Sequence, residues 1–326
     1  MQKQYKPLDF SAVSSYPIAS RDNKVNIEEH FSGEISAGLT LREFATRLPR
    51  LLAAESLLAV ADLIVAARLK QRPVILAIGG HVIKCGLQPV IKGLIRAGAI
   101  SAVAMNGSAA IHDFEVSLIG ATSEDVGAVL HAGDFGFSAE TGQGMNLALR
   151  EAQPRGVGFG QAIGEYILAA GHPHAEHSLL ACCAENKIPA TVHVALGTDI
   201  IHQHPQADGG VTGEMSYRDF KLLAAVIADL GEGGLWLNVG SAVLLPEVFL
   251  KALSVAQNLG HRVNNFSTAN FDMIQHYRPL QNVIKRPTSG GGKGYTITGH
   301  HEINIPLLAA LVHEGLAAAG LQGEQI

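Results

Sequence analysis

Two glycine-containing turns carry the clearest chemical signal in the sequence. The apolar run 74–78 is followed by Gly79 and Gly80, and a second apolar run ends in Asn106-Gly107-Ser108. Because glycine has no side chain, backbone N–H groups and the start of a following helix can approach a ligand at such turns. The turns therefore predict a site for an anionic or nucleotide ligand. Their spacing differs from G-x-G-x-x-G, so spacing alone does not identify a dinucleotide.

The segment between these turns forms one expected strand–helix–strand unit. Residues 83–98 carry apolar side chains at helical spacing between two short apolar runs. This order favours a parallel pair of strands with a right-handed crossover. We expect a first helix over 40–70, loops with short helices over 120–160, later helices over 175–186, 216–230, 246–258 and 304–319, and later strands over 190–196, 234–239 and 262–268.

This alternation predicts an α/β fold with a doubly wound, mainly parallel sheet. In such folds ligands bind beyond the carboxyl ends of the strands, and here each expected strand ends in small or polar residues. Asp199 is the strongest cofactor candidate among them, because a carboxylate accepts hydrogen bonds from two ribose hydroxyls. A helix N-cap is the alternative role for Asp199.

Composition limits the class of protein. The chain has 326 residues, of which 47% are hydrophobic and 16% charged, so it can bury a large core and is expected to be a soluble globular protein. A formal net charge of −5 without a long basic run gives little basis for binding nucleic acid or an anionic membrane. The three cysteines lack C-x-x-C spacing, which favours a reducing compartment, the cytoplasm.

The expected domain organisation is simple. Residues 1–40 read as a polar N-terminal arm, and residues 41–326 read as a single α/β domain. The most apolar run, 51–69, is interrupted by charged residues and so predicts a soluble helix and not a membrane span. The low charge and the apolar helices predict a homo-oligomer, most simply a tetramer.

Histidine is unusually frequent, with 15 residues. His174 and His177 lie three residues apart beside Glu176, a spacing that permits a divalent metal, but no H-E-x-x-H motif is present and we assign no metal. The histidines in the expected loops, His202 among them, are candidates for general acid–base catalysis, because an unperturbed imidazole titrates near neutral pH. Ordinary polar loop residues are the alternative.

The order of the strand-end motifs resembles the deoxyhypusine synthase family, over roughly residues 45 to 318. The matching segments are 79–113, 186–199, 240–250, 265–272 and 305–308. The resemblance implies a Rossmann-like single domain that forms a homotetramer and binds NAD between subunits. It also implies transfer of a butylamine group from spermidine to a protein lysine, through an imine on an enzyme lysine.

Specific residues follow from this resemblance. The family's nucleotide pocket corresponds to the two glycine turns, its Thr-Asp pair matches Thr198-Asp199, and its Asn-Thr-Ala segment matches residues 267–269. The cofactor-binding candidates are therefore Gly79, Gly80, His81, Asn106, Gly107, Ser108, Asp199, Gly240, Thr268 and Ala269. The family's nucleophilic lysine corresponds to Lys293, and imine formation there requires a neutral amine.

The acidic residues that bind the polycation in this family are largely missing at the matching positions. The segments 271–278 and 200–204 keep one carboxylate, Asp272, and the family's glutamate in the second turn is replaced by His112. With histidines at these positions, we expect a pocket suited to a neutral or anionic substrate or a metal, and poor use of spermidine. The catalytic candidates are Lys293, His112, His202 and His276.

The sequence thus predicts an NAD-binding enzyme of deoxyhypusine synthase-like type that acts on a small non-polyamine substrate. The reaction would be an oxidation, an elimination or a group transfer, with a lysine imine as one route. Two alternatives remain. One is a true deoxyhypusine or homospermidine synthase-type transferase, and the other is a non-catalytic nucleotide-binding or assembly protein.

Overall fold

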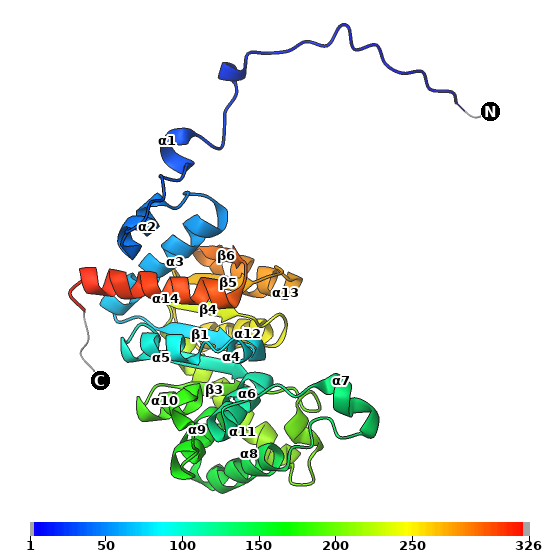
Figure 1. Ribbon diagram of the computed structural model, residues 1–326, viewed down its shortest axis with the longest axis vertical. Helices are drawn as coiled ribbons and strands as arrows, with labels where there is room; N and C mark the ends of the chain where they lie inside the picture. Colours follow the sequence, from blue (N-terminus) through cyan, green and yellow to red (C-terminus); the bar gives the residue numbers. More distant parts are fainter. Residues whose placement is uncertain (1–2, 322–326) are drawn as a thin grey trace.

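Six parallel strands form one sheet in the computed structural model, which describes residues 3 to 321 (Figure 1). Their order is β3-β2-β1-β4-β5-β6, so the chain reverses direction across the sheet between β1 and β4. This confirms the expected doubly wound α/β fold. The strands are β1 (Val74–Ile78), β2 (Ala102–Asn106), β3 (Ala190–His193), β4 (Leu235–Val239), β5 (Ser267–Asp272) and β6 (Gly294–Thr298).

Helices cover both faces of the sheet (Figure 1). They are α1 (Ile27–His30), α2 (Leu41–Arg47), α3 (Leu52–Leu69), α4 (Gly80–Lys84), α5 (Gln88–Arg96), α6 (Gly107–Ile119), α7 (Val126–Val129), α8 (Ala139–Ala152), α9 (Phe159–Ala169), α10 (Leu179–Glu185), α11 (Gly209–Ala228), α12 (Leu244–Asn258), α13 (Tyr277–Pro279) and α14 (His301–Ala318). Short turns of other helix types link several of them.

Alternate strand residues enter two separate cores. Leu76 and Ile78 of β1 belong to the core under α3, α5 and α14, whereas Ile75 packs on the opposite face with α11 and α12. On that second face the rings of Trp236 and Phe249 stack at 4.3 Å. A strand that is buried on both faces has a nearly continuous apolar sequence, and this is why the sequence predicted the strand positions.

Three expected elements differ from the structure. The helix over 40–70 is split into α2 and α3 around Pro49, because proline disfavours helical backbone in the residue before it. The strand expected over 262–268 is β5, which instead runs to Asp272. The loop-rich segment 120–160 contains a 14-residue helix, α8, whose glycines concealed its buried face.

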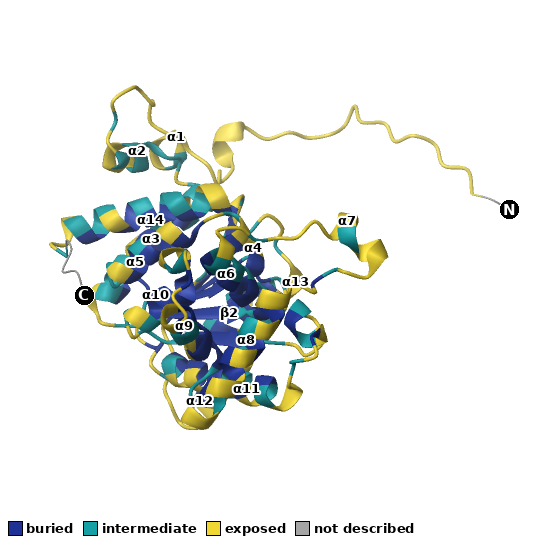
Figure 2. Cartoon of the chain, turned by 60° about the horizontal axis from the view of Figure 1, so that its bottom comes forward, coloured by how far each residue is buried: buried dark blue, intermediate teal, exposed yellow. Residues whose placement is uncertain are grey.

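The N-terminal segment 3–40 is almost entirely exposed and extends away from the sheet and its helices (Figures 1 and 2). Within it, α1 is capped by Asn26, whose side chain accepts a hydrogen bond from the backbone of Glu29. No helix within residues 3 to 321 combines the length and apolar character needed to cross a bilayer.

Candidate functional site

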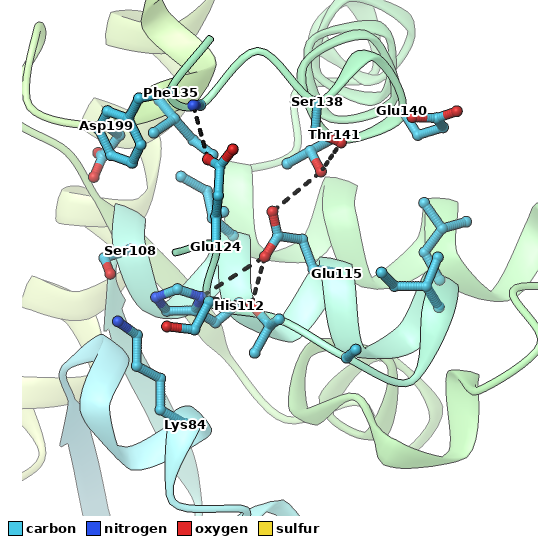
Figure 3. Close-up of a pocket in the computed structure, with 18 of the residues that line it drawn as sticks. Lys84, Ser108, His112, Glu115, Glu124, Phe135, Ser138, Glu140, Thr141 and Asp199 are labelled. Carbon is cyan, nitrogen blue, oxygen red and sulfur yellow. Dashed lines mark hydrogen bonds and ion pairs between the residues drawn. The ribbon is translucent and has the colours of Figure 1, made fainter. Parts of the chain in front are cut away.

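A cavity of about 880 Å³ lies beyond the carboxyl ends of β1, β2 and β3 (Figure 3). Its walls come from α4, α6, the start of α8, the segment 121–138 and the residues that follow β3. This volume is within the usual range for small-molecule sites. The structure therefore places a binding-sized cavity at the edge of the sheet where the fold predicts one.

Helix α6 supplies three polar side chains to this cavity. Ser108, His112 and Glu115 follow one another at spacings of four and three residues, which places them on one face of the helix. The helix begins at Gly107, directly after β2, and the side chain of Asn106 caps it by accepting a hydrogen bond from Ala109 N at 2.9 Å. The end of β2 thus determines where α6 starts, and so where these three side chains lie.

Gly80 brings α4 against the same face of α6. A Cβ at Gly80 would lie 2.3 Å from Ser108 Oγ and 3.0 Å from His112 Cδ2, so any larger residue would have to displace the Ser108 hydroxyl. The approach also places Lys84, at the end of α4, on the cavity wall beside His112 (Figure 3). We expected Gly80 to let a ligand approach the backbone. In the structure, side-chain atoms of Ser108 and His112 occupy the space beside it.

A chain of hydrogen bonds joins His112 to Glu115 through Thr122. The Thr122 hydroxyl donates to Glu115 Oε2, and His112 Nδ1 lies 2.7 Å from Thr122 Oγ1. Because the single hydroxyl proton is given to Glu115, Nδ1 of His112 carries the proton in the second bond. In the neutral ring, Nε2 then keeps its lone pair and can act as a base.

Glu115 is held as a carboxylate. Burial raises the pKa of this carboxyl, but hydrogen bonds from His112 and Thr122, the charge of His112 and a bond from Thr141 at 3.2 Å outweigh it, and the net pKa is lowered. Glu115 Oε2 also lies 3.8 Å from His112 Nδ1. A proton taken up by His112 would therefore be stabilised by an adjacent negative charge.

Asp199 lies where β2 and β3 end side by side. A Cβ at Gly107 would lie 2.0 Å from Asp199 Oδ2, so the carboxyl group occupies the space of the missing side chain. Burial raises the pKa of Asp199 to about 6. The neighbouring His202 accepts hydrogen bonds at Nδ1 from the backbone N–H groups of Gly197 and Asp199, at 3.2 and 3.3 Å.

The charges lining the cavity differ from the expectation. Four carboxylate residues line it, and among the described lining residues Lys84 is the one lysine or arginine. The prediction of a pocket without carboxylates is therefore wrong for this cavity. Three of them lie outside the segments matched to the family: Glu115 within α6, Glu124 in the loop after it and Glu140 at the start of α8. The fourth is Asp199 of the matched Thr-Asp pair.

Lys293 does not reach this cavity. It directly precedes β6, at the amino edge of the sheet, whereas the cavity lies at the carboxyl edge. Its side chain is exposed, with Nζ 4.9 Å from the centre of the Tyr295 ring. Within one chain Lys293 and His112 are therefore not brought together, because the lysine precedes its strand while His112 follows β2.

Two other expected catalytic histidines are also outside the cavity wall. His276 is exposed at the start of α13, after β5, and His202 lies behind Asp199 with both of its Nδ1 contacts to backbone. Of the four catalytic candidates, the structure therefore places only His112 in the lining of the described cavity.

The remaining cofactor candidates divide between the two edges of the sheet. Thr268 and Ala269 are buried near the amino end of β5, and the Thr268 hydroxyl donates to Val283 O at 2.7 Å. Their expected position at a strand end is wrong because β5 starts and ends later than predicted. Gly79 and Gly240 lie at the carboxyl edge, where a Cβ at Gly79 would be 2.1 Å from Gly240 O.

His81 lies at the same edge beside a buried histidine. Its ring centre is 5.9 Å from that of His301, which begins α14. The metal candidates His174 and His177 have ring centres 6.5 Å apart, and His177 Nε2 lies 3.4 Å from Glu176 Oε1. Within residues 3 to 321, no group of three or more histidine, cysteine or acidic side chains is arranged to hold a metal ion.

Sequence reasoning missed several lining residues. Lys84, Glu115, Thr122 and Thr141 all line the cavity, and among them Glu115 had a recognisable signal in the sequence. Glu115 lies three residues after His112 on a predicted helix, which is the spacing of a helical pair. Thr122 and Thr141 come from the loop-rich segment, where no periodicity indicates which side chains meet.

Comparison with known proteins gives a likeness of fold. No protein family model matches the sequence, and no curated protein matches it. Among solved structures, the chain is similar to a conserved putative LOR/SDH protein from Methanococcus maripaludis S2, with 14% identity over 79% of this chain and 69% of that one and a TM-score of 0.50. At this identity the likeness shows the α/β fold alone.

Two further structures are similar at lower TM-scores. ArgZ, an arginine dihydrolase from the ornithine-ammonia cycle in cyanobacteria, matches at 14% identity over 81% of this chain, with a TM-score of 0.48. The chain spans 33% of the length of ArgZ. A putative deoxyhypusine synthase from Entamoeba histolytica matches at 12% identity over 84% of this chain and 93% of that one, with a TM-score of 0.46.

Proposed function

We propose that this protein is an NAD-binding enzyme that acts on a small substrate in the cavity at the carboxyl ends of β1 to β3. The observation that carries the proposal is the hydrogen-bonded set His112, Thr122 and Glu115 inside a cavity of about 880 Å³. Nε2 of His112 has no hydrogen-bond partner among residues 3 to 321, and a carboxylate lies beside the ring. This is the arrangement of a general base and the group that orients it.

His112 and Glu115 have separate roles in this proposal. Nε2 of His112 is directed away from Glu115, toward the side of the cavity where Lys84 and Ser108 lie, and there it takes a proton from the substrate (Figure 3). Glu115 holds the ring through Thr122 and stabilises the imidazolium that forms. Oxidation, elimination and group transfer all need such a proton transfer.

Asp199 is the residue we assign to the cofactor. Its carboxyl group lies at the junction of two strand ends beside the start of α6, and above about pH 6 it is ionised and can accept hydrogen bonds from ribose hydroxyls. Bound NAD would supply a hydride acceptor. The order of the strands and the resemblance to the deoxyhypusine synthase family both support this cofactor.

A second candidate function gains support from the cavity charges. Four carboxylates around one lysine favour a basic substrate, as a deoxyhypusine or homospermidine synthase-type transferase would require. Against that candidate, Lys293 is exposed at the other edge of this chain. We therefore place an enzyme acting on a small basic substrate first, and the polyamine transferase second.

Titration with NADH tests the cofactor assignment. We expect NADH to quench intrinsic fluorescence and to raise the melting temperature of the protein by linkage. The variant Asp199→Asn should bind at least tenfold more weakly, and Asp62→Asn, an exposed aspartate of α3, should bind like the unmodified protein. If neither NAD nor NADH binds at millimolar concentration, the NAD assignment fails and the non-catalytic alternative gains ground.

A further inference from the structure

The cavity lining carries one lysine and four carboxylates. Figure 3 shows Lys84 beside His112 and Ser108, with Asp199 on the same side of the cavity and Glu140 on the far side. A uniformly cationic ligand would place a positive group against Lys84, and an anionic ligand would face the glutamates. One cationic side chain among four carboxylates therefore suits a ligand that carries one carboxylate and at least one cationic group.

The lysine side of the cavity can hold a carboxylate. Lys84 is the one lysine or arginine among the described lining residues, and Ser108 offers a hydroxyl beside it. Gly80 keeps α4 and α6 in contact, because a Cβ there would lie 2.3 Å from Ser108 Oγ. The lysine and the serine are thus held on adjoining helices that cannot separate without opening this contact.

The glutamate side can hold a cation. Glu124 is tied in place because its Oε2 accepts a hydrogen bond from Gly136 N at 2.9 Å. Glu140, in the first turn of α8, is exposed at the rim of the cavity. Each of these carboxylates can accept hydrogen bonds from a cationic group with N–H donors, such as an ammonium or a guanidinium.

We propose that the substrate is a basic amino acid, bound with its carboxylate at Lys84 and its side-chain cation at Glu124 and Glu140. This inference rests on the proposed function and names the substrate class of the same cavity. It differs from a polyamine in requiring the carboxylate. In this proposal Lys84 makes the site selective for a basic amino acid over a diamine of the same length, because it binds the carboxylate.

Three related compounds test the proposal by isothermal titration of the full chain: L-ornithine, L-norvaline and putrescine. Norvaline lacks the distal cation, and putrescine lacks the carboxylate. We expect ornithine to bind about tenfold more tightly than either. L-Lysine and L-arginine, tested in parallel, report the preferred length and head group.

Variants assign each charge to its residue. Lys84→Met should weaken ornithine about tenfold and should not weaken putrescine, which loses a repulsive charge, and Glu140→Gln should weaken ornithine and putrescine but not norvaline. Glu151→Gln, on the same helix as Glu140, and Lys70→Met, an exposed lysine at the end of α3, are the matched controls. A circular dichroism melt of each variant confirms that it is folded.

The outcomes separate this inference from the cofactor proposal. Binding of NADH without any binding of the three basic amino acids would overturn the substrate class and leave the NAD enzyme standing. Equal or tighter binding of putrescine would overturn it in favour of a polyamine. Ornithine binding that depends on Lys84 and Glu140 but occurs without NADH binding would support the substrate class and remove the cofactor.

Discussion

The carboxyl group of Asp199 lies against the α-carbon of Gly107, at a separation that leaves no room for a Cβ. The contact joins the end of β3 to the start of α6, two segments that are 92 positions apart in the sequence. The start of a helix favours negative charge, while burial raises the pKa of this carboxyl to about 6. Asp199 thus titrates close to neutral pH at the edge of the cavity.

Replacing Gly107 with alanine tests this contact. The added Cβ would lie 2.0 Å from Asp199 Oδ2 and must displace the carboxyl group. We expect a loss of about 1–3 kcal/mol in the free energy of unfolding, as for other overpacked sites, together with weaker binding of NADH. Urea denaturation and fluorescence titration measure the two effects.

Gly213→Ala is the control, because Gly213 lies within α11 and no other side chain or distant backbone atom would be within 4 Å of its new Cβ. Alanine there should stabilise the protein by about 0.5–1 kcal/mol. If Gly107→Ala behaves like this control, the close contact with Asp199 does not exist in solution.

The pH dependence of stability tests the pKa of Asp199. Its folded pKa of about 6 is above the ordinary value of 3.8, so the folded state binds the proton more tightly. The resulting stabilisation is complete below about pH 4 and is lost as the pH rises through 6. Asp199→Asn should remove this loss, so the stability of the variant relative to the unmodified protein should rise by about 3 kcal/mol between pH 4 and pH 8.

Asp219 has a raised pKa of about 7, also from burial, and contributes a similar trend. The comparison must therefore be between the unmodified protein and Asp199→Asn at each pH, so that the contribution of Asp219 cancels. Identical pH profiles for the two proteins would show that Asp199 is not buried as the structure has it.

The link through Thr122 provides a third prediction. Thr122→Val keeps the shape of the side chain but removes the hydroxyl that joins His112 to Glu115. We expect a loss of about 1–3 kcal/mol in the free energy of unfolding, because two partly buried polar groups lose a partner. Any turnover that depends on His112 should fall with it.

Thr296→Val serves for comparison. Thr296 lies in β6, and its hydroxyl has no hydrogen-bond partner among residues 3 to 321. Its replacement should change stability by less than about 0.5 kcal/mol. Equal effects of the two substitutions would mean that the hydrogen-bonded chain contributes nothing beyond the hydroxyl itself.

The sheet could be predicted from the sequence because its strands are buried on both faces. The run Val74–Ile78 is entirely apolar and Leu235–Val239 is apolar except for Asn238; glycine follows each run, and both are strands at almost the expected positions. β5 was misplaced because polar residues such as Asn270 lie inside it. Asn270 is buried and accepts a hydrogen bond from Asn238 of β4 at 2.7 Å, a partner that no local pattern reveals.

The site could be predicted only where local spacing determines it. His112 and Asp199 follow strand ends or helix starts, and both reach the cavity. Lys293 lies outside the cavity of its own chain because it precedes β6, at the opposite edge of the sheet. The sequence did not predict Glu124 and Glu140 as lining residues. Their positions depend on how the segment between α6 and α8 folds over the sheet, and tertiary contacts determine that fold.

A fourth prediction concerns Lys293. Imine-forming lysines are activated by burial or by a nearby cation, whereas Lys293 is exposed at the amino edge of the sheet. After treatment with a small aldehyde and borohydride, peptide mass spectrometry should find Lys293 modified no faster than the exposed Lys70. Selective modification of Lys293 would restore the imine route, and Lys293→Ala should otherwise leave NADH binding unchanged.

The last prediction is the oligomeric state, for which we propose a homotetramer. The N-terminal segment places large apolar side chains in solvent: Leu8 is 82% exposed and Phe10 is 73% exposed. Burying each of them against a second copy would contribute about 1.5–3 kcal/mol, which favours association. Sedimentation velocity at micromolar concentration should show a tetramer, and the double substitution of Leu8 and Phe10 by aspartate should shift the protein toward smaller species.

Lys6→Ala, in the same segment, should leave the distribution unchanged. A stable monomer for the unmodified chain would contradict the proposal, and a tetramer unaffected by the aspartates would place the interface elsewhere.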